Sequence, residues 1–304
     1  MGASFRIAFL AFFAVLVSFA ATVPLRDSKV LALQICLDRE GFSPNTIDGQ
    51  WGRKSQVALA TYCAVKNIGL PSSPEEAKDV LFPGDENLFE HATVTQSDID
   101  SLTEIPSAPE EKAKLPAMGY STIQEMFAER GHLSQRALVR LNPSLPWPNP
   151  PAGSKVLIPH FPSGQKKVIA TALRVSLSRF EVTAFDGKGR LVALFPCSIA
   201  AEKSKLPPKG EIHVTAYAPN PNYTYTPDFV RKGERAKKHI FPAGPNNPVG
   251  SAWISLSLPT YGIHGTPNPE TIGRPESHGC FRLANWNARR LLALVDVGTA
   301  VVVE

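Results

Sequence analysis

The chain has 304 residues, of which 43% are hydrophobic and 19% are charged. This apolar content is enough to form real cores and excludes a globally disordered chain. At roughly 100–200 residues per domain, the length predicts two or three domains. The formal net charge of +5 is unevenly spread: residues 166–304 hold 18 Lys and Arg against 10 Asp and Glu, and residues 22–165 hold 13 against 17. A basic C-terminal half suits an anionic surface or a carboxylate-rich substrate. No basic-aromatic stripe supports a nucleic-acid partner.

The first 21 residues are typical of a targeting signal. Arg6 precedes an almost wholly apolar run from Ile7 to Ala21, and Ser18-Phe19-Ala20 offers a small-x-small cleavage site. This run is short for a membrane span, so residues 1–21 are predicted to be a signal peptide, with an uncleaved anchor helix as the alternative. Both predict an exported protein of the periplasm or cell wall, where disulfides can form. Cys36 and Cys63 are close enough in the chain to pair, but the sequence does not decide whether they do.

Residues 28–70 are predicted to form a small helical module. An apolar run from Val30 to Leu37 has the length of a helix, Asp48–Gly52 forms a tight turn, and helical periodicity resumes from Ser55 to Val65. The stretch LALQICLDREGFSPNTIDGQWGRKSQVALATYC, and its DGQWG turn above all, resembles the three-helix peptidoglycan-binding domain. The resemblance implies binding to the glycan or stem peptide of the wall. A helical bundle kept only for packing is the alternative.

Two further segments precede the C-terminal half. Residues 71–118 are rich in Pro, Glu, Asp and Ser and are predicted to be a linker. Within residues 119–160, two short amphipathic helices, Thr122–Arg130 and Ser134–Leu141, precede a short strand at Val156–Pro159. The LNP and AGSKVLIP stretches resemble a LysM sugar-binding domain, although the opening strand and Gly-Asp-Thr turn of that family are absent. Glycan binding and a structural spacer both remain open for this LysM-like module.

From residue 167 to residue 304 the pattern changes to short β-rich runs. Gly and Pro separate these runs, and Asp186–Gly189 is predicted to be a hairpin turn. One helix is predicted from Asn285 to Leu294. A mainly β domain follows, either a β-sandwich or an open barrel. The strands are expected at Val168–Leu173, Arg174–Leu177, Phe180–Phe185, Leu191–Ile199, Ile212–Ala216, Trp253–Leu258, Gly262–His264 and Ala300–Val303.

The segment from Tyr261 to Asn285 places one cysteine near two histidines. Cys280 lies shortly before the predicted helix, and a thiol near a helix N-terminus and an imidazole is expected to have a lowered pKa and to act as a nucleophile. Gly279 allows a tight turn, so that consecutive backbone N–H groups can form an oxyanion hole. A buried structural thiol is one alternative. A zinc site of His264, His278 and Cys280 is another, although no further ligand motif accompanies it.

The same segment resembles the catalytic domain of the YkuD-type L,D-transpeptidases. The resemblance rests on His264, followed by Ser277-His278-Gly279-Cys280-Phe281-Arg282, and on the block PAGPNNPVGSAWISLSLPTYGIHGT; it covers residues 167–304. It implies a fold of that type. No cofactor or metal requirement is expected, because no complete ligand set is visible beyond the catalytic His and Cys. The resemblance further implies that Cys280 attacks the stem-peptide bond between the diamino acid and D-Ala, that His264 is the base, and that carbapenems acylate the thiol better than penicillins.

The resemblance also implies supporting roles around the nucleophile. The Gly265 carbonyl would orient His264, and the N–H groups of Gly279 and Cys280 would stabilise the oxyanion. His278 is expected to shape the pocket, with the role of base as its alternative. Candidate substrate-binding residues are Tyr261, Ser277, Arg282 and Asn285. For Arg282, a clamp for a substrate carboxylate and an internal salt bridge are both open.

The acceptor of the acyl group stays undetermined. An amine of another stem, an outer-membrane lipoprotein or a free D-amino acid would give cross-linking, attachment or exchange, whereas water would give an L,D-carboxypeptidase or endopeptidase. A non-catalytic peptidoglycan-binding protein is the third interpretation, which the presence of Cys280 and His264 disfavours. Residues 217–247 are predicted to form a lid with an exposed basic run at Arg231–Lys238.

Overall fold

A computed structural model describes residues 25–84, 87–162, 168–227, 238–277 and 279–304. The predicted signal peptide, most of the basic run of the predicted lid and His278 therefore lie outside the described residues. Within these described ranges, no helix is both long enough and apolar enough to cross a membrane.

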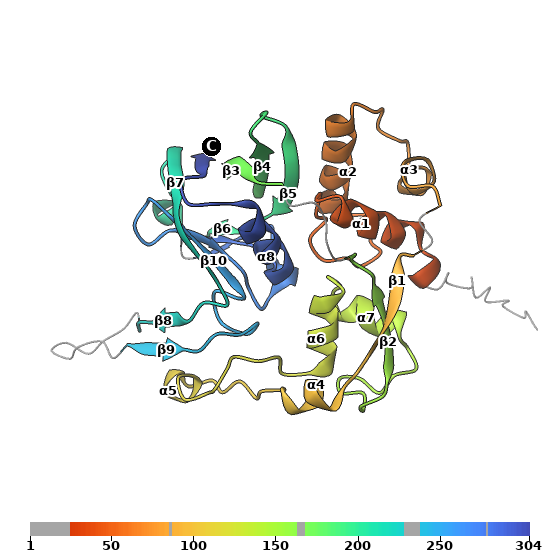
Figure 1. Ribbon diagram of the computed structural model, residues 1–304, viewed down its shortest axis with the longest axis horizontal. Helices are drawn as coiled ribbons and strands as arrows, with labels where there is room; N and C mark the ends of the chain where they lie inside the picture. The colour runs from red at the N-terminus through yellow and green to blue at the C-terminus, as the bar shows by residue number, and fades with distance from the viewer. Residues whose placement is uncertain (1–24, 85–86, 163–167, 228–237, 278) are drawn as a thin grey trace, which may run out of the picture.

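The C-terminal half is organised around one eight-stranded mixed sheet (Figure 1). Helix α8 (Asn285–Leu294) packs against β10, β11 and β7, and its buried residues join the core of the sheet. The predicted mainly β domain is therefore confirmed, but the described residues contain no second sheet of similar size, so a two-sheet sandwich is wrong. In spatial order the strands are β13 (Phe281–Arg282), β11 (Gly262–His264), β10 (Ala252–Leu256), β7 (Gly210–Pro219), β14 (Ala300–Val303), β3 (Ala170–Ser176), β4 (Glu181–Asp186) and β5 (Leu191–Pro196).

Local signals located several of these elements well. Strands β11 and β14 and helix α8 have the predicted bounds. Asp186 holds the predicted hairpin turn, because its carboxylate accepts the backbone N–H groups of Lys188 and Arg190 at 2.9 and 3.0 Å. Two small sheets flank the large one: β6 (Ile199–Ala200) pairs with β12 (Pro275–Ser277), and β8 (Tyr223–Tyr225) pairs with β9 (His239–Phe241).

The N-terminal helices also follow from the sequence. After the short helix η1 (Leu25–Asp27), α1 (Lys29–Arg39) and α2 (Arg53–Lys66) correspond to the two predicted helical runs, and α3 (Pro74–Leu81) follows. The side chain of buried Gln34 fixes the turn between α1 and α2 by accepting the N–H groups of Asp48 and Gly49 and donating to the Gln50 carbonyl. Cys36 and Cys63 are both buried in this module.

The predicted linker at residues 71–118 is largely wrong. It contains α3, β1 (Phe89–Thr93), α4 (Gln96–Asp100) and α5 (Pro109–Lys112). Strand β1 pairs antiparallel with β2 (Lys155–Pro159). Helices α6 (Ile123–Arg130) and α7 (Gln135–Leu141) lie between these two strands in the sequence. The segment 119–160 therefore pairs with a strand that lies within the predicted linker. The sequence did not reveal strand β1, because most of its side chains are exposed and need not be apolar.

The helical modules pack directly on the C-terminal half. Leu194 of β5 belongs to the apolar cluster of α1 and α2, and its backbone pairs with Phe42. Arg290 of α8 donates to the carbonyls of Asp38 and Arg39 at the end of α1. Figure 1 shows α8 facing both α1 and α6, and α6 contacts α8. The face of α8 that is turned away from the sheet is thus covered by the N-terminal half of the chain.

Candidate active site

A cavity of about 960 Å³ lies at the β11–β13 edge of the sheet. It extends to the β8–β9 hairpin, where Tyr225 stacks on Phe241 with ring centroids 5.5 Å apart. The described parts of the predicted lid thus border the cavity. Six predicted site residues line it together: Tyr261, His264, Ser277, Gly279, Cys280 and Arg282.

Strand pairing explains why His264 and Cys280 meet. Strands β11 and β13 run parallel, with Ile263 opposite Phe281 and His264 opposite Arg282. Cys280 immediately precedes β13, so the register places the nucleophile candidate beside Gly262, at the start of β11 and two residues before His264. This parallel register converts a spacing of sixteen residues in the chain into a shared cavity wall.

His264 is a buried, neutral imidazole. Its Nδ1 lies 2.6 Å from the Gly265 carbonyl oxygen, which accepts a hydrogen bond only if Nδ1 carries the proton. The ring also stacks on Trp253, with centroids 5.5 Å apart. Burial, together with the nearby Arg282 charge, lowers the pKa of His264 to about 4, although the Gly265 hydrogen bond acts in the opposite direction. The unprotonated Nε2 is therefore available as a base at neutral pH.

Cys280 is partly buried, and its thiol lies 3.6 Å from the Thr260 carbonyl. Burial raises the pKa of this thiol, and the backbone N–H of Gly262 offsets only part of the effect. The expected lowering of the pKa is therefore wrong. Cys280 precedes a strand, whereas α8 begins five residues later at Asn285, so the helix N-terminus does not stabilise a thiolate here. The resting pair is a neutral thiol and a neutral imidazole.

The loop before the nucleophile is held by Ser277. Its hydroxyl donates to the Cys280 carbonyl at 2.6 Å and accepts the Gly279 N–H at 3.2 Å. Gly279 has a φ of +149°, a conformation that favours glycine. Ser277 thus shapes the loop through its hydroxyl, and its contact with substrate stays a prediction. Because Ser277 takes the Gly279 N–H, the Cys280 N–H is the better oxyanion donor: it has no partner among the described residues.

Arg282 and Tyr261 form the flanks of the cavity. Arg282 Nη2 lies 3.4 Å from a carboxylate oxygen of half-exposed Glu276, and its buried Nε has no partner within the described part of the chain. The salt bridge predicted as one alternative is therefore present, and it leaves a donor unused. Tyr261 donates its hydroxyl to the Lys205 carbonyl at 3.0 Å, so it fixes the wall beside Gly279.

Asn285 does not reach the cavity, which contradicts its predicted role in substrate binding. It is fully buried at the start of α8. Its Oδ1 accepts the Ser251 N–H at 3.1 Å, and its Nδ2 donates to Glu129 Oε2 at 2.8 Å and to the Pro245 carbonyl at 3.1 Å. Both amide protons and one acceptor position of Asn285 are thus used inside the protein.

This asparagine lies directly behind the histidine loop. A Cβ added at Gly265 would meet Asn285 Oδ1 at 2.3 Å, so only glycine fits there. Glu129, on α6 of the LysM-like module, receives Nδ2 of Asn285 and also Arg289 Nη1 at 2.8 Å. The Gly265 carbonyl that orients His264 therefore rests on a buried network that extends to α6. No local pattern in the sequence singles out Glu129, which is 135 residues from His264.

Within the described ranges, no group of three or more His, Cys, Asp and Glu side chains is arranged to hold a metal ion. His278, the third ligand of the zinc alternative, lies outside those ranges.

Sequence comparisons agree with this site. Residues 170–303 match the model of the YkuD family, described as the L,D-transpeptidase catalytic domain. The YkuD protein of Bacillus licheniformis is 29% identical over 177 residues, which cover 58% of this chain and 90% of that protein. A protein of Fuscovulum blasticum, encoded in the ATP synthase subunits region, is 32% identical over 143 residues, covering 47% of this chain and 71% of the relative. The chain belongs to the family of YkuD-type L,D-transpeptidase catalytic domains.

A solved structure, the L,D-transpeptidase from Mycobacterium smegmatis, aligns with 50% of this chain and 63% of its own length. The identity is 16% and the TM-score is 0.35, so the family assignment rests on the sequence matches.

Proposed function

We propose that the protein is a peptidoglycan L,D-transpeptidase with Cys280 as its nucleophile and His264 as its general base. The observation that carries the proposal is the shared cavity of the two side chains, together with an imidazole whose Nδ1 is committed to the Gly265 carbonyl. That hydrogen bond takes the place of the carboxylate in other catalytic triads and leaves Nε2 free to accept a proton.

The first half-reaction begins from the neutral pair. As Cys280 Sγ attacks the carbonyl between the diamino acid and D-Ala of a tetrapeptide stem, its proton moves to His264 Nε2. The Cys280 N–H donates to the developing oxyanion. The C–N bond then breaks, the leaving D-Ala amine takes the proton from His264, and a thioester remains on Cys280. Transferring the proton during attack suits groups whose resting forms are both uncharged.

In the second half-reaction an acceptor amine attacks the thioester and gives its proton to His264, which returns it to the leaving thiolate. The side-chain amine of another stem would form a 3→3 cross-link. An outer-membrane lipoprotein or a D-amino acid would instead give attachment or exchange, and water would give a carboxypeptidase. Arg282 is proposed to bind a stem carboxylate, because it faces the cavity with a donor left over from its salt bridge.

The protein is proposed to be exported. The helical module at residues 28–70 and the LysM-like module are proposed to bind it to the cell wall. Both pack against the catalytic half, so truncation would expose the apolar cluster around Leu194. The exposed side chains of Gln50 and Arg53 in and beside the DGQWG turn are better targets. Their double replacement by alanine should weaken pelleting with purified sacculi and spare turnover of soluble muropeptides.

The deciding experiment is mass analysis of disaccharide-tetrapeptide muropeptides after incubation with the wild type and with Cys280→Ala. The proposal expects release of D-Ala with formation of a dimer, and neither product with the variant. D-Ala release without a dimer or an exchanged product would favour the carboxypeptidase. Release that is unchanged in Cys280→Ala would contradict the proposal.

A further inference from the structure

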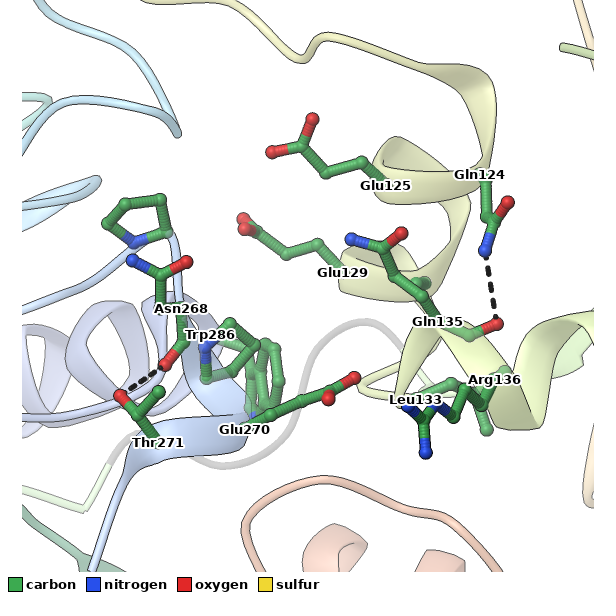
Figure 2. A pocket seen from close by; sticks show the side chains of 13 residues that line it. Gln124, Glu125, Glu129, Leu133, Gln135, Arg136, Asn268, Glu270, Thr271 and Trp286 are labelled. Atoms are coloured by element: carbon green, nitrogen blue, oxygen red, sulfur yellow. Dashed lines mark hydrogen bonds between the residues drawn. The ribbon is translucent and has the colours of Figure 1, made fainter. Parts of the chain in front are cut away.

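A second cavity, of about 430 Å³, lies between the LysM-like module and the catalytic half (Figure 2). One wall consists of α6 and α7, and the other of residues 267–271, which include helix η3 (Pro269–Thr271), together with Trp286 of α8. Pro267 and Asn268 line this cavity and the catalytic cavity alike. A ligand that fills both would therefore pass over these two residues.

Polar side chains lie on both sides of this cavity. Figure 2 shows Gln124, Glu125 and Gln135 on the α6–α7 side, opposite Asn268, Glu270 and Thr271. Side-chain amides both donate and accept hydrogen bonds, whereas carboxylates only accept them. The cavity thus offers many acceptors and several donors to a ligand that carries both kinds of group.

Two of the carboxylates differ in what they can still bind. Glu129 is already held by Arg289, Tyr120 and Asn285, so it belongs to the network behind His264. Glu125 accepts the Ser121 N–H at 2.7 Å and is half-buried, and burial raises the pKa of its carboxyl. A hydroxyl donor from a ligand would replace part of the hydration that Glu125 has lost.

Trp286 supplies an independent indication that a ligand binds here. The residue is 4% exposed, and its indole Nε1 is buried without a hydrogen-bond partner among the described residues. Its ring is held by stacking on His132, with centroids 5.1 Å apart and an interplanar angle of 9°. A buried N–H without an acceptor is costly and uncommon, and it can be satisfied only by an acceptor oxygen. An ammonium group offers no such oxygen.

We propose that this cavity binds a neutral saccharide of the glycan strand, whose hydroxyl and amide groups donate to Glu125 and Glu270 and accept from Trp286. This inference rests on the proposed function and deepens it. Because a stem peptide is joined to a sugar of the strand, a sugar held beside Pro267 and Asn268 would lead its stem toward Cys280. The cavity would thereby make the enzyme prefer stems that are still attached to glycan.

The test compares D-Ala release from a disaccharide-tetrapeptide and from the sugar-free tetrapeptide by the full chain. The wild type should show a lower KM for the sugar-bearing substrate, and Trp286→Phe should raise that KM about fivefold, the effect of one lost hydrogen bond, without changing the KM of the free peptide. Glu270→Ala should act in the same direction. Glu211→Ala, which removes an exposed carboxylate from β7, is the matched control and should leave both KM values unchanged.

Binding is measured separately by calorimetry, with an N-acetylglucosamine tetrasaccharide and with the free tetrapeptide as probes of Cys280→Ala. Saccharide binding that weakens in the added Trp286→Phe background supports the site. Equal KM values for both substrates would overturn it. Calorimetry in which only the amine-bearing tetrapeptide binds, and the saccharide does not, would overturn it as well. Failure of the wild type to process either substrate would instead overturn the proposed function, so the two failures are distinguishable.

Discussion

The two sides of the His264–Gly265 segment differ in how they are built. On the cavity side, His264 shares a wall with Ser277, Gly279 and Cys280, and these residues come from one short motif. On the opposite side, Asn285 packs against Gly265 and is held by Glu129 from α6 of another module. The reactive groups are thus local in sequence, whereas their support is assembled from distant segments. The positions of His264 and Cys280 should therefore depend on residues that lie outside the sequence motif.

The largest expected effect is at the thiol itself. Cys280→Ala should lower D-Ala release by roughly four orders of magnitude or more, because the covalent route is lost. Its circular dichroism and thermal unfolding should match those of the wild type, since the side chain is only partly buried. Alkylation of the native wild type should label Cys280 and not Cys197, which is fully buried and whose pKa burial raises strongly. Labelling of Cys197 in the folded protein would contradict the expectation that Cys280 is accessible and Cys197 is not.

Removing the base should have the next largest effect. His264→Gln should slow acylation of Cys280 by a carbapenem roughly 10²- to 10⁴-fold, because a neutral thiol without a base is a poor nucleophile. Intact-protein mass spectrometry over time measures the rate. The wild type should give a stable carbapenem adduct and little ampicillin adduct. Equal rates for the variant and the wild type would remove His264 from the mechanism.

The buried imidazole should also make stability depend on pH. Its pKa of about 4 lies below the unfolded value of 6.5, so the unfolded chain binds the extra proton first as pH falls. Stability from this group is complete above pH 6.5 and is lost between pH 6.5 and pH 4, by about 3 kcal/mol. Urea unfolding at pH 7 and pH 4 should show this loss in the wild type relative to His264→Gln. An equal loss in both proteins would mean that His264 is not buried as a neutral group.

The smallest effect is expected on the supporting side. Glu129→Ala leaves Asn285 Nδ2 and Arg289 without their carboxylate, so kcat for the sugar-free tetrapeptide should fall about tenfold with little change in KM. Glu129→Gln, which keeps an acceptor, should recover part of the loss. Glu104→Ala, at an exposed position, serves as the control. A kcat equal to that of the wild type in Glu129→Ala would mean that the two sides of the segment are independent.

The sequence by itself determined the elements and groups whose signals are local. The run Ser277–Arg282 after His264 identified the family, and the bounds of β11, β14 and α8 followed from short patterns of apolar, Gly and Pro residues. These features depend on neighbours in the chain, and for such features the residue types alone indicate the local structure. The same local evidence correctly located the Asp186 hairpin turn.

Only the tertiary structure decided the environment of those groups. The pKa directions of Cys280 and His264 follow from burial, which depends on the β11–β13 pairing and on Trp253, and the lowered thiol pKa expected from sequence was wrong for that reason. Strand β1 was missed, because its partner β2 lies more than 60 residues away and its side chains are mostly exposed. The link from Glu129 to Asn285 spans 156 residues. Burial and long-range hydrogen bonds are properties of contacts across the fold, so a local pattern of residues does not specify them.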